Sequence, residues 1–354
     1  QADRGAGHPQ EQRVRRGPAD RAGAGSGVTA AASQRRTARP VILGVVGDSA
    51  AGKTTITRGL VRVLGEEHVA HICTDDYHRY DRRQRAELGI TPLHPDCNHI
   101  DIIAQHLAHL RRGEAVLKPV YRHKDGTFGA PVYVAPERFT VIEGLLGYHL
   151  PEMRDVYDVR VFLNPPEELR RRWKVQRDCS RRGYTTDEVL AELDRREADS
   201  EAFIRPQRRY ADMLVSFRPP EGEPPADQAD QGHLEAELTL CDGLPHPDLS
   251  SLINRKPDGL TLIERDGERV LRIPGRMDPD HAAAIEETLW ARMHFASHLR
   301  ARRLGEFTIG TDLQRSESLA LVQLLILYHL VTARAAVALG GEGTRTLSAV
   351  AAPA

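Results

Sequence analysis

The sequence has little lysine, little cysteine and almost no net charge. Lysine supplies only five of the 49 basic residues, so nearly every cation is an arginine and a lone arginine carries little information. The net charge of −1 argues against an overall basic field for nucleic acid or an acidic membrane. The four cysteines are scattered, without a CxxC pair or zinc-ligand spacing. We therefore expect a reduced, cytoplasmic location and no nucleic-acid partner.

Long apolar runs are also missing. The longest, Leu319 to Leu330, is short and interrupted for a bilayer span, so we expect a core segment and no membrane partner. No secretory apolar region precedes the first expected strand.

The two ends of the chain are poor in large apolar residues. Residues 1–38 are rich in Gly, Ala and Arg and cannot offset the entropy of ordering, so we expect them to be disordered. A transit peptide is the functional alternative, but Asp3, Glu11, Asp20 and the scarcity of serine argue against a targeting segment. An extended or misassigned start is the interpretation we prefer. Residues 341–354 are expected to form a second disordered tail.

Strand-like and helix-like segments alternate between these ends. Val41–Val46 is an apolar run typical of a strand buried on both faces, and similar strands are expected at 139–142, 159–163 and 213–217. Apolar residues at helical spacing follow at 56–64 and 100–110, and an Arg-rich helix follows Asn164. This alternation predicts an α/β fold with a doubly wound, mainly parallel sheet. A Pro- and acid-rich stretch at 218–231 ends the pattern. Beyond it we expect a hairpin over 260–273, turning at Asp266-Gly267, and helices near 279–303 and 315–337.

The strongest motif is a full GxxxxGK[ST] sequence between the first expected strand and helix. Its glycines let backbone N–H groups surround phosphate oxygens, its lysine reaches the β- and γ-phosphates, and its threonine offers a hydroxyl to Mg²⁺. An ordinary Gly-rich turn would rarely match every position of this pattern. We therefore predict an ATP-binding loop, called the phosphate loop below, made of Gly47, Asp48, Ser49, Ala50, Ala51, Gly52, Lys53, Thr54 and Thr55.

An acidic residue ends the expected strand at 139–142. Glu143 would lie beside the phosphate loop at the carboxyl edge of a doubly wound sheet. There it would hold Mg²⁺ directly or through water, together with Thr54. The alternative is a solvated Glu at a strand end.

A charged segment begins where a second strand is expected to end. Asp75 is placed to accept the proton of an acceptor hydroxyl, as phosphoryl transfer requires. His78, Arg82 and Arg85 follow within a few residues and could hold a substrate phosphate. A charged, solvated turn is the alternative.

The Arg-rich helix carries four cations on one face. Arg170, Lys174, Arg177 and Arg181 recur at i, i+4, i+7 and i+11. A cationic helix that closes over ATP would neutralise charge in the transition state and exclude water, which favours a lid. An Arg-rich solvated face is the competing interpretation.

Together these segments resemble the phosphoribulokinase and uridine kinase family of P-loop kinases, and within it the phosphoribulokinases of plants and cyanobacteria. The resemblance runs from about Val41 to Phe217, roughly half the chain. It implies a P-loop kinase domain at 39–218. From the hairpin and helices expected beyond it, we interpret 219–340 as a β/α extension packed on this domain, with a separate domain as the alternative. Its most specific segments are DSAAGKTT (48–55), DDYHRYDRRQR (75–85), KPVYRH (118–123), VIEGL (141–145), KVQRD (174–178) and FIRPQRRYAD (203–212).

The resemblance also implies a reaction and its residues. The family's phosphoribulokinases transfer the ATP γ-phosphate to the C1 hydroxyl of ribulose 5-phosphate, a Calvin-cycle step, and commonly form homodimers. At matching positions Asp75 resembles the catalytic base, and Lys53, Thr54 and Glu143 resemble the ATP·Mg²⁺ group. The remaining matches are the sugar-phosphate pocket, Arg82, Arg85, Tyr121 and His123 with His78 nearby, and the lid with its acid, Lys174, Arg177 and Asp178.

Two departures concern the presumed acceptor site. Leu146 stands where similar enzymes usually carry a His, and an Asn-x-Phe-Asp pattern reads Asn98-His99-Ile100-Asp101. A uridine or cytidine kinase is therefore the nearest alternative, although a nucleoside has no phosphate for Arg82 and Arg85 to hold. A non-catalytic nucleotide-binding regulatory protein is the alternative from another class. It would predict a degraded base position, whereas Asp75 and Glu143 are intact.

The phosphate loop also bears on redox control. Light-regulated relatives pair a cysteine in this loop with one just before the DDYH segment. Cys73 matches the second position, but Ala51 occupies the first. We predict that this thiol switch is absent, so oxidation followed by reductant leaves activity unchanged. A large, reductant-reversible loss of activity traced to a disulfide at Cys73 would contradict this.

Overall fold

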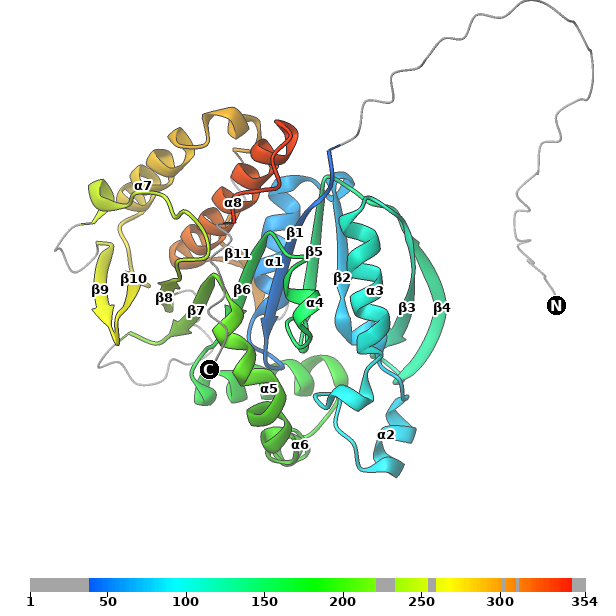
Figure 1. The fold of residues 1–354 in the computed structure, drawn as a ribbon. Helices are drawn as coiled ribbons and strands as arrows, with labels where there is room; N and C mark the ends of the chain where they lie inside the picture. Colours follow the sequence, from blue (N-terminus) through cyan, green and yellow to red (C-terminus); the bar gives the residue numbers. More distant parts are fainter. Residues whose placement is uncertain (1–37, 221–232, 254–258, 301–303, 310–311, 346–354) are drawn as a thin grey trace, which may run out of the picture. The chain divides into compact units, whose positions relative to one another are not determined.

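The central sheet is built from the apolar runs of the sequence. The computed structural model describes residues 38–220, 233–253, 259–300, 304–309 and 312–345. Eight strands form one sheet in the order β2-β5-β1-β6-β7-β8-β10-β9 (Figure 1). The first five run parallel and the last three pair antiparallel. The strands are β1 (Val41–Gly47), β2 (Val69–Cys73), β5 (Phe139–Gly144), β6 (Val159–Leu163), β7 (Met213–Arg218), β8 (Glu235–Leu240), β9 (Thr261–Arg265) and β10 (Glu268–Ile273).

Helices cover both faces of this sheet. Leu43 and Val45 of β1 belong to an apolar cluster that includes side chains of α1, α7 and α8. Ile42 and Val46 belong to a second cluster that includes side chains of α3 and α4. The doubly wound α/β fold predicted from the sequence is therefore confirmed. The helices are α1 (Lys53–Leu64), α2 (Arg82–Leu88), α3 (Ile100–Arg111), α4 (Pro151–Arg154), α5 (Glu167–Arg182), α6 (Thr186–Asp199), α7 (Pro279–Ala291) and α8 (Glu317–Ala338).

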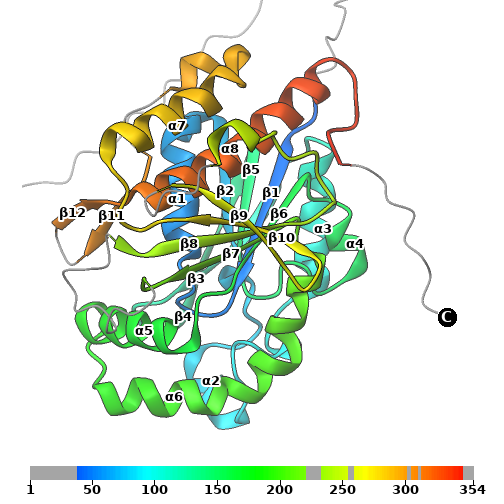
Figure 2. The same cartoon turned by 90° about the vertical axis from the view of Figure 1, so that its left-hand side faces the viewer.

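The C-terminal part of the chain continues the same sheet. β8 pairs antiparallel with β7, and β10 and β9 follow as the expected hairpin (Figure 2). Asp266 and Gly267 turn it with φ values of 54° and 78°, the left-handed geometry of a two-residue hairpin turn. Residues from Ala38 onward form one compact unit. A domain boundary at 218 stays a prediction, and residues 221–232 lie outside the described part of the chain.

The two tails expected from the sequence fall mostly outside the described residues, which exclude 1–37 and 346–354. Residues 341–345 are described, however. Arg345 forms an ion pair of 2.6 Å with the buried carboxylate of Asp212. The ordered chain therefore extends past 340, because a buried carboxylate is stabilised by a cation at that position.

The helix expected near 279–303 is shorter than predicted. α7 ends at Ala291, and a short 3₁₀ segment follows at His294–Leu299. Met293 and Ala296 leave helical geometry with φ values of −112° and −114°. Both side chains are buried in the core, and the turn allows both to face it. Apolar spacing alone did not reveal this break.

α8 is a core helix, as its apolar run predicted. The whole helix has 22 residues with a mean hydropathy of 1.7 in its most apolar window, so length and composition alone would allow a membrane span. The apolar run recognised in the sequence, Leu319 to Leu330, is shorter than the helix. In the structure 72% of that window is buried against the rest of the protein. The burial explains the apolar composition.

Two short ribbons were not predicted from the sequence. β3 (Val116–Arg122) pairs with β4 (Thr127–Val134), and β11 (Glu306–Ile309) pairs with β12 (Asp312–Arg315). β4 contains Gly129 and Pro131, both weak strand formers, and β12 is exposed along its whole length. β12 lacks the apolar alternation by which strands are recognised, and in β4 the alternation of Phe128, Ala130, Val132 and Val134 is interrupted by the glycine and the proline.

One close approach joins α8 to α1. The buried Gln323 side chain accepts a hydrogen bond from Gly305 N at 2.9 Å and donates to Thr55 O at 3.2 Å. It lies directly over Gly59, where an added Cβ would stand 2.0 Å from the Gln323 amide nitrogen. Position 59 therefore has room for glycine alone.

We predict that Gly59→Ala destabilises the protein despite the better helix propensity of alanine. Overpacking and disturbed Gln323 hydrogen bonds should outweigh that gain and lower the free energy of unfolding by about 2 kcal/mol. Urea unfolding of Gly59→Ala, Gln323→Ala and the double variant measures this. The double variant should be more stable than the sum of the single effects predicts, because shortening the side chain at position 323 removes the clash. Strict additivity would contradict the contact.

Candidate active site

The phosphate loop joins β1 to α1, as the sequence predicted. Gly52 begins the helix with φ 94°, a left-handed conformation that favours glycine. Among the described residues, a pocket with a volume of about 2350 Å³ lies next to this loop. Residues 49–55 line it, whereas Gly47 and Asp48 do not. Every other predicted site residue also lines this pocket: Asp75, His78, Arg82, Arg85, Tyr121, His123, Glu143, Lys174, Arg177 and Asp178.

Lys53 lies across the phosphate loop. Its ammonium donates hydrogen bonds to Gly47 O at 2.8 Å and Asp48 O at 2.7 Å. Burial lowers the pKa of Lys53 because it disfavours the charged form, although the charges of Asp75 and Glu143 oppose this shift. The lysine is thus a half-buried cation at the helix N-terminus, where phosphate oxygens are favoured.

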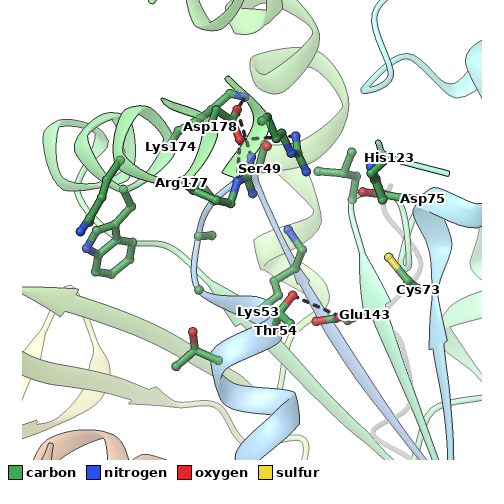
Figure 3. Close-up of a pocket in the computed structure, with 18 of the residues that line it drawn as sticks. Ser49, Lys53, Thr54, Cys73, Asp75, His123, Glu143, Lys174, Arg177 and Asp178 are labelled. Carbon is green, nitrogen blue, oxygen red and sulfur yellow. Dashed lines mark hydrogen bonds and ion pairs between the residues drawn. The ribbon is translucent and has the colours of Figure 1, made fainter. Parts of the chain in front are cut away.

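Glu143 and Thr54 form an oxygen pair beside the loop (Figure 3). Thr54 Oγ1 donates to Glu143 Oε1 at 3.2 Å, and Thr57 Oγ1 donates to Oε2 at 3.0 Å. Burial favours a raised pKa for Glu143, but the hydrogen bond and charge of His71 and the charge of Lys53 outweigh it and lower the pKa. A carboxylate and a hydroxyl are the hard oxygen ligands that Mg²⁺ prefers. These two residues therefore fit a magnesium site next to a bound nucleotide.

The two adjacent aspartates have different surroundings. Asp76 accepts a hydrogen bond from Tyr121 N at 2.9 Å and pairs with the buried ammonium of Lys118, which ties the segment after β2 to β3. Asp75 instead faces the pocket (Figure 3). Burial favours a raised pKa for Asp75, but His78 and Lys53 outweigh it and lower the pKa. Asp75 is thus kept as a carboxylate in the pocket, while Asp76 is structural.

The predicted sugar-phosphate residues gather on one side of Asp75. Arg85 donates to the Tyr121 hydroxyl at 2.6 Å and lies 5.0 Å from its ring centroid. Arg82 donates to His123 O at 2.6 Å. His123 stands with Asp75 on one side of the pocket (Figure 3). The structure therefore brings together residues from two distant segments of the chain.

Asn98 supports the site through His78, whereas the sequence analysis named it only as part of the Asn-x-Phe-Asp pattern. Its Oδ1 lies 2.8 Å from His78 Nδ1, and its amide donates to Pro92 O and His94 O. Burial lowers the pKa of His78 to about 4, so this ring is neutral at pH 7. With Nδ1 donating to Asn98, the Nε2 lone pair remains an acceptor. The sequence alone did not reveal this contact, because twenty positions separate the two residues.

The lid helix is only partly as predicted. Lys174 Nζ and Arg177 Nε both donate to Asp178, each at 2.8 Å. Burial and the charge of Arg196 lower the pKa of Lys174 to about 8, against the opposing charge of Asp178. Arg182 also approaches Asp178, at 3.4 Å. The side chain of Arg181 lies outside the described residues.

Arg170 does not join this group, contrary to the predicted four-cation face. It is 4% exposed, donates to Ser49 O at 3.1 Å and lies 3.4 Å from the Asp48 carboxylate. The other Asp48 oxygen accepts a hydrogen bond from Ser200. Arg170 and Asp48 therefore hold the phosphate loop in place through contacts with its backbone and with Ser200. Helical spacing indicated a shared face but not which end of it is buried.

We predict that Asp75→Asn and Asp76→Asn separate stability from chemistry. Asp76→Asn leaves the buried Lys118 without its anionic partner and should lower the free energy of unfolding by about 2–3 kcal/mol. Asp75→Asn breaks no hydrogen bond among the described residues and should change it by under about 1 kcal/mol. Urea unfolding of the two matched variants tests this. Equal destabilisation would contradict the distinction.

Known proteins with related sequences match this site region. The model of the Phosphoribulokinase / Uridine kinase family matches residues 42–221. A Synechocystis sp. phosphoribulokinase is 39% identical over 181 residues, covering 51% of this chain and 54% of the relative. The chain thus spans about half the length of that relative. A uridine kinase from Oceanobacillus iheyensis is 32% identical, covering 52% of this chain and 88% of the relative.

A solved structure supports the fold. The phosphoribulokinase from Rhodobacter spheroides superimposes with a TM-score of 0.52 at 19% identity, covering 74% of this chain and 99% of that chain. At this identity the likeness concerns the fold alone. The family assignment follows from the family match, which includes the phosphate loop, Asp75, Glu143 and the lid. The chain belongs to the phosphoribulokinase and uridine kinase family.

Proposed function

We propose that this chain transfers the γ-phosphate of ATP to the C1 hydroxyl of ribulose 5-phosphate, giving ribulose 1,5-bisphosphate and ADP. The observation that carries the proposal is the placement of Asp75 between two cationic regions. Lys53 and the phosphate loop lie on one side, and Arg82 and Arg85 lie on the other. A donor phosphate and an acceptor phosphate would each find cations there, with a base between them.

The residues of the chain have distinct roles in this reaction. Asp75 accepts the proton of the C1 hydroxyl as its oxygen attacks the γ-phosphorus, and the bond to the β,γ-bridging oxygen breaks to release ADP. Lys53 is placed to neutralise charge on the β- and γ-phosphates, and Lys174 and Arg177 add positive charge from the lid. Thr54 and Glu143 would hold Mg²⁺, which when bound screens the phosphate charges.

The acceptor side favours a phosphorylated sugar over a nucleoside. Arg85 is fixed by Tyr121 and by Tyr80 O at 2.8 Å, so its guanidinium is pre-organised. A nucleoside offers no anion for such a group. The match to phosphoribulokinases of a cyanobacterium and of plants supports this choice. The homodimer and the cytoplasmic location stay predictions.

ADP release tests the proposal directly. The purified protein is given ATP·Mg²⁺ with ribulose 5-phosphate, and parallel wells contain uridine or other pentose phosphates. We expect turnover with ribulose 5-phosphate and a loss of about 10²–10⁴-fold in Asp75→Asn, because the general base is removed. Asp280→Asn, an exposed position on α7, is the matched control and should retain full activity.

The other outcomes are equally clear. Turnover with uridine alone would overturn the acceptor and leave the nucleotide site in place. No turnover with any acceptor, from a protein that still binds ATP, would overturn phosphotransfer and favour a regulatory protein.

A further inference from the structure

The two ends of one helical hairpin meet at the phosphate loop. α5 and α6 lie side by side and are joined by a short turn at 183–185 (Figure 1). Near the start of α5, Arg170 donates a hydrogen bond to Ser49 O at 3.1 Å. Directly after α6, Ser200 donates a hydrogen bond to the Asp48 carboxylate. Both ends of the hairpin that carries the lid residues therefore contact two consecutive residues of the loop.

The backbone changes its geometry at the point of the second contact. α6 ends at Asp199, and a π-helical turn follows at Ser200–Ile204. A π turn holds more residues than an α turn, so it redirects the side chains that follow, and such turns are frequent at functional sites. Ser200 is only 1% exposed, so its contact with the phosphate loop is shielded from water.

The neighbouring residue, Asp199, contacts the acceptor side of the site. Thr91 Oγ1 donates a hydrogen bond to Asp199 Oδ2 at 2.5 Å. Thr91 belongs to the segment between α2 and α3, and Pro92 of this segment lines the pocket. We call Thr91, Asp199, Ser200 and Asp48 the junction. It connects the acceptor-side segment to the phosphate loop through two consecutive residues.

Asp48 in turn holds the backbone of the phosphate loop. Its carboxylate accepts a hydrogen bond from Ser49 N at 2.5 Å. Its carbonyl oxygen accepts from Lys53 Nζ at 2.7 Å and from Ala51 N at 3.1 Å. A change in the orientation of the Asp48 side chain would therefore reach the backbone N–H groups that surround phosphate oxygens.

We propose that Ser200 is a positioning residue for nucleotide binding, and that the junction makes the phosphate loop and the acceptor-side segment depend on each other. The Ser200 hydroxyl holds the buried Asp48 carboxylate in the orientation that fixes Ser49 N. Without this donor the carboxylate turns toward other partners, because a buried acceptor that loses a hydrogen bond is costly. The four junction residues do not line the pocket, so they act through the loop and the segment rather than on the ligand.

The inference rests on nucleotide binding within the proposed function, but not on the identity of the acceptor. A titration with ATP·Mg²⁺ alone therefore tests it separately from the ribulose 5-phosphate assay. Residues that act through one connected element give non-additive effects when they are changed together, whereas independent residues give additive ones.

Calorimetric titration of the full chain with ATP·Mg²⁺ tests the contact of Ser200. We expect Ser200→Ala to raise the Kd about tenfold, because the phosphate loop is then less pre-organised. Ser200→Thr keeps the hydroxyl and should bring the Kd back to within about threefold of the value for the unchanged chain. Ser297→Ala is the matched control and should leave the Kd unchanged, because Ser297 is exposed and does not line the pocket.

Thr91→Val tests the connection between the two sides. This variant removes the hydrogen bond to Asp199 on the acceptor side of the junction. We expect it to raise the Kd for ATP·Mg²⁺ about threefold in the unchanged chain. In the Ser200→Ala background the same change should have an effect of under about 1.5-fold, because the junction then no longer reaches Asp48.

Three results would overturn the inference. An unchanged Kd in Ser200→Ala, or equal Kd values for Ser200→Ala and Ser200→Thr, would mean that the hydroxyl does not position the loop. An unchanged Kd in Thr91→Val, or additive effects of Thr91→Val and Ser200→Ala, would mean that the two sides are independent. Should Ser200→Ala fail to fold, Ser200→Cys provides the same comparison, because it retains the side chain with a weaker donor. No acceptor is present, so failure of the ribulose 5-phosphate assay leaves this test intact.

Discussion

The parallel register of three neighbouring strands is the constraint on which the site depends. Glu143 of β5 lies opposite Val45 of β1 on one side and Cys73 of β2 on the other. This alignment places the phosphate loop, Glu143 and the segment with Asp75 at one edge of the sheet. A slip of one residue would move Glu143 by about 3.3 Å and turn its side chain to the other face. The chemistry is thus positioned by backbone hydrogen bonds remote from the ligand.

The lid helix is anchored at the same edge. Its first turns contact the phosphate loop through Arg170, whereas its last turns carry the cluster around Asp178. The carboxylate of Asp178 holds Lys174 and Arg177 close together, which keeps two cations in place without bound phosphate. Pre-positioned charges need less reorganisation when negative charge develops. The N-terminal turns of α5 are therefore fixed to the phosphate loop, which the rest of the helix would cover as a lid.

The sequence predicted the position of those candidate site residues that belong to a short, ordered pattern. The phosphate loop and Glu143 could be recognised because a glycine-rich turn and a strand-ending acid each sit at a fixed place relative to an apolar strand. The roles of neighbours with the same chemistry could not be separated. Asp76 differs from Asp75 through Lys118 and Tyr121, which lie more than forty positions further along the chain. Helical spacing shows which residues share a face but not how deeply each side chain is buried. Arg170 was therefore predicted to be a lid cation.

The contact of Gln323 with α1 also has a consequence for the order in which the protein can form. Gln323 and Thr55 are separated by 268 positions, so the phosphate loop helix acquires this partner only after residue 323 has been synthesised. At about 5–20 residues per second, the interval is roughly 13–54 s. Throughout this time α1 exposes the surface around Gly59 and Leu60 that α8 later buries. A nascent chain of this protein therefore carries an unfinished nucleotide site, and a protecting chaperone would find its binding surface there.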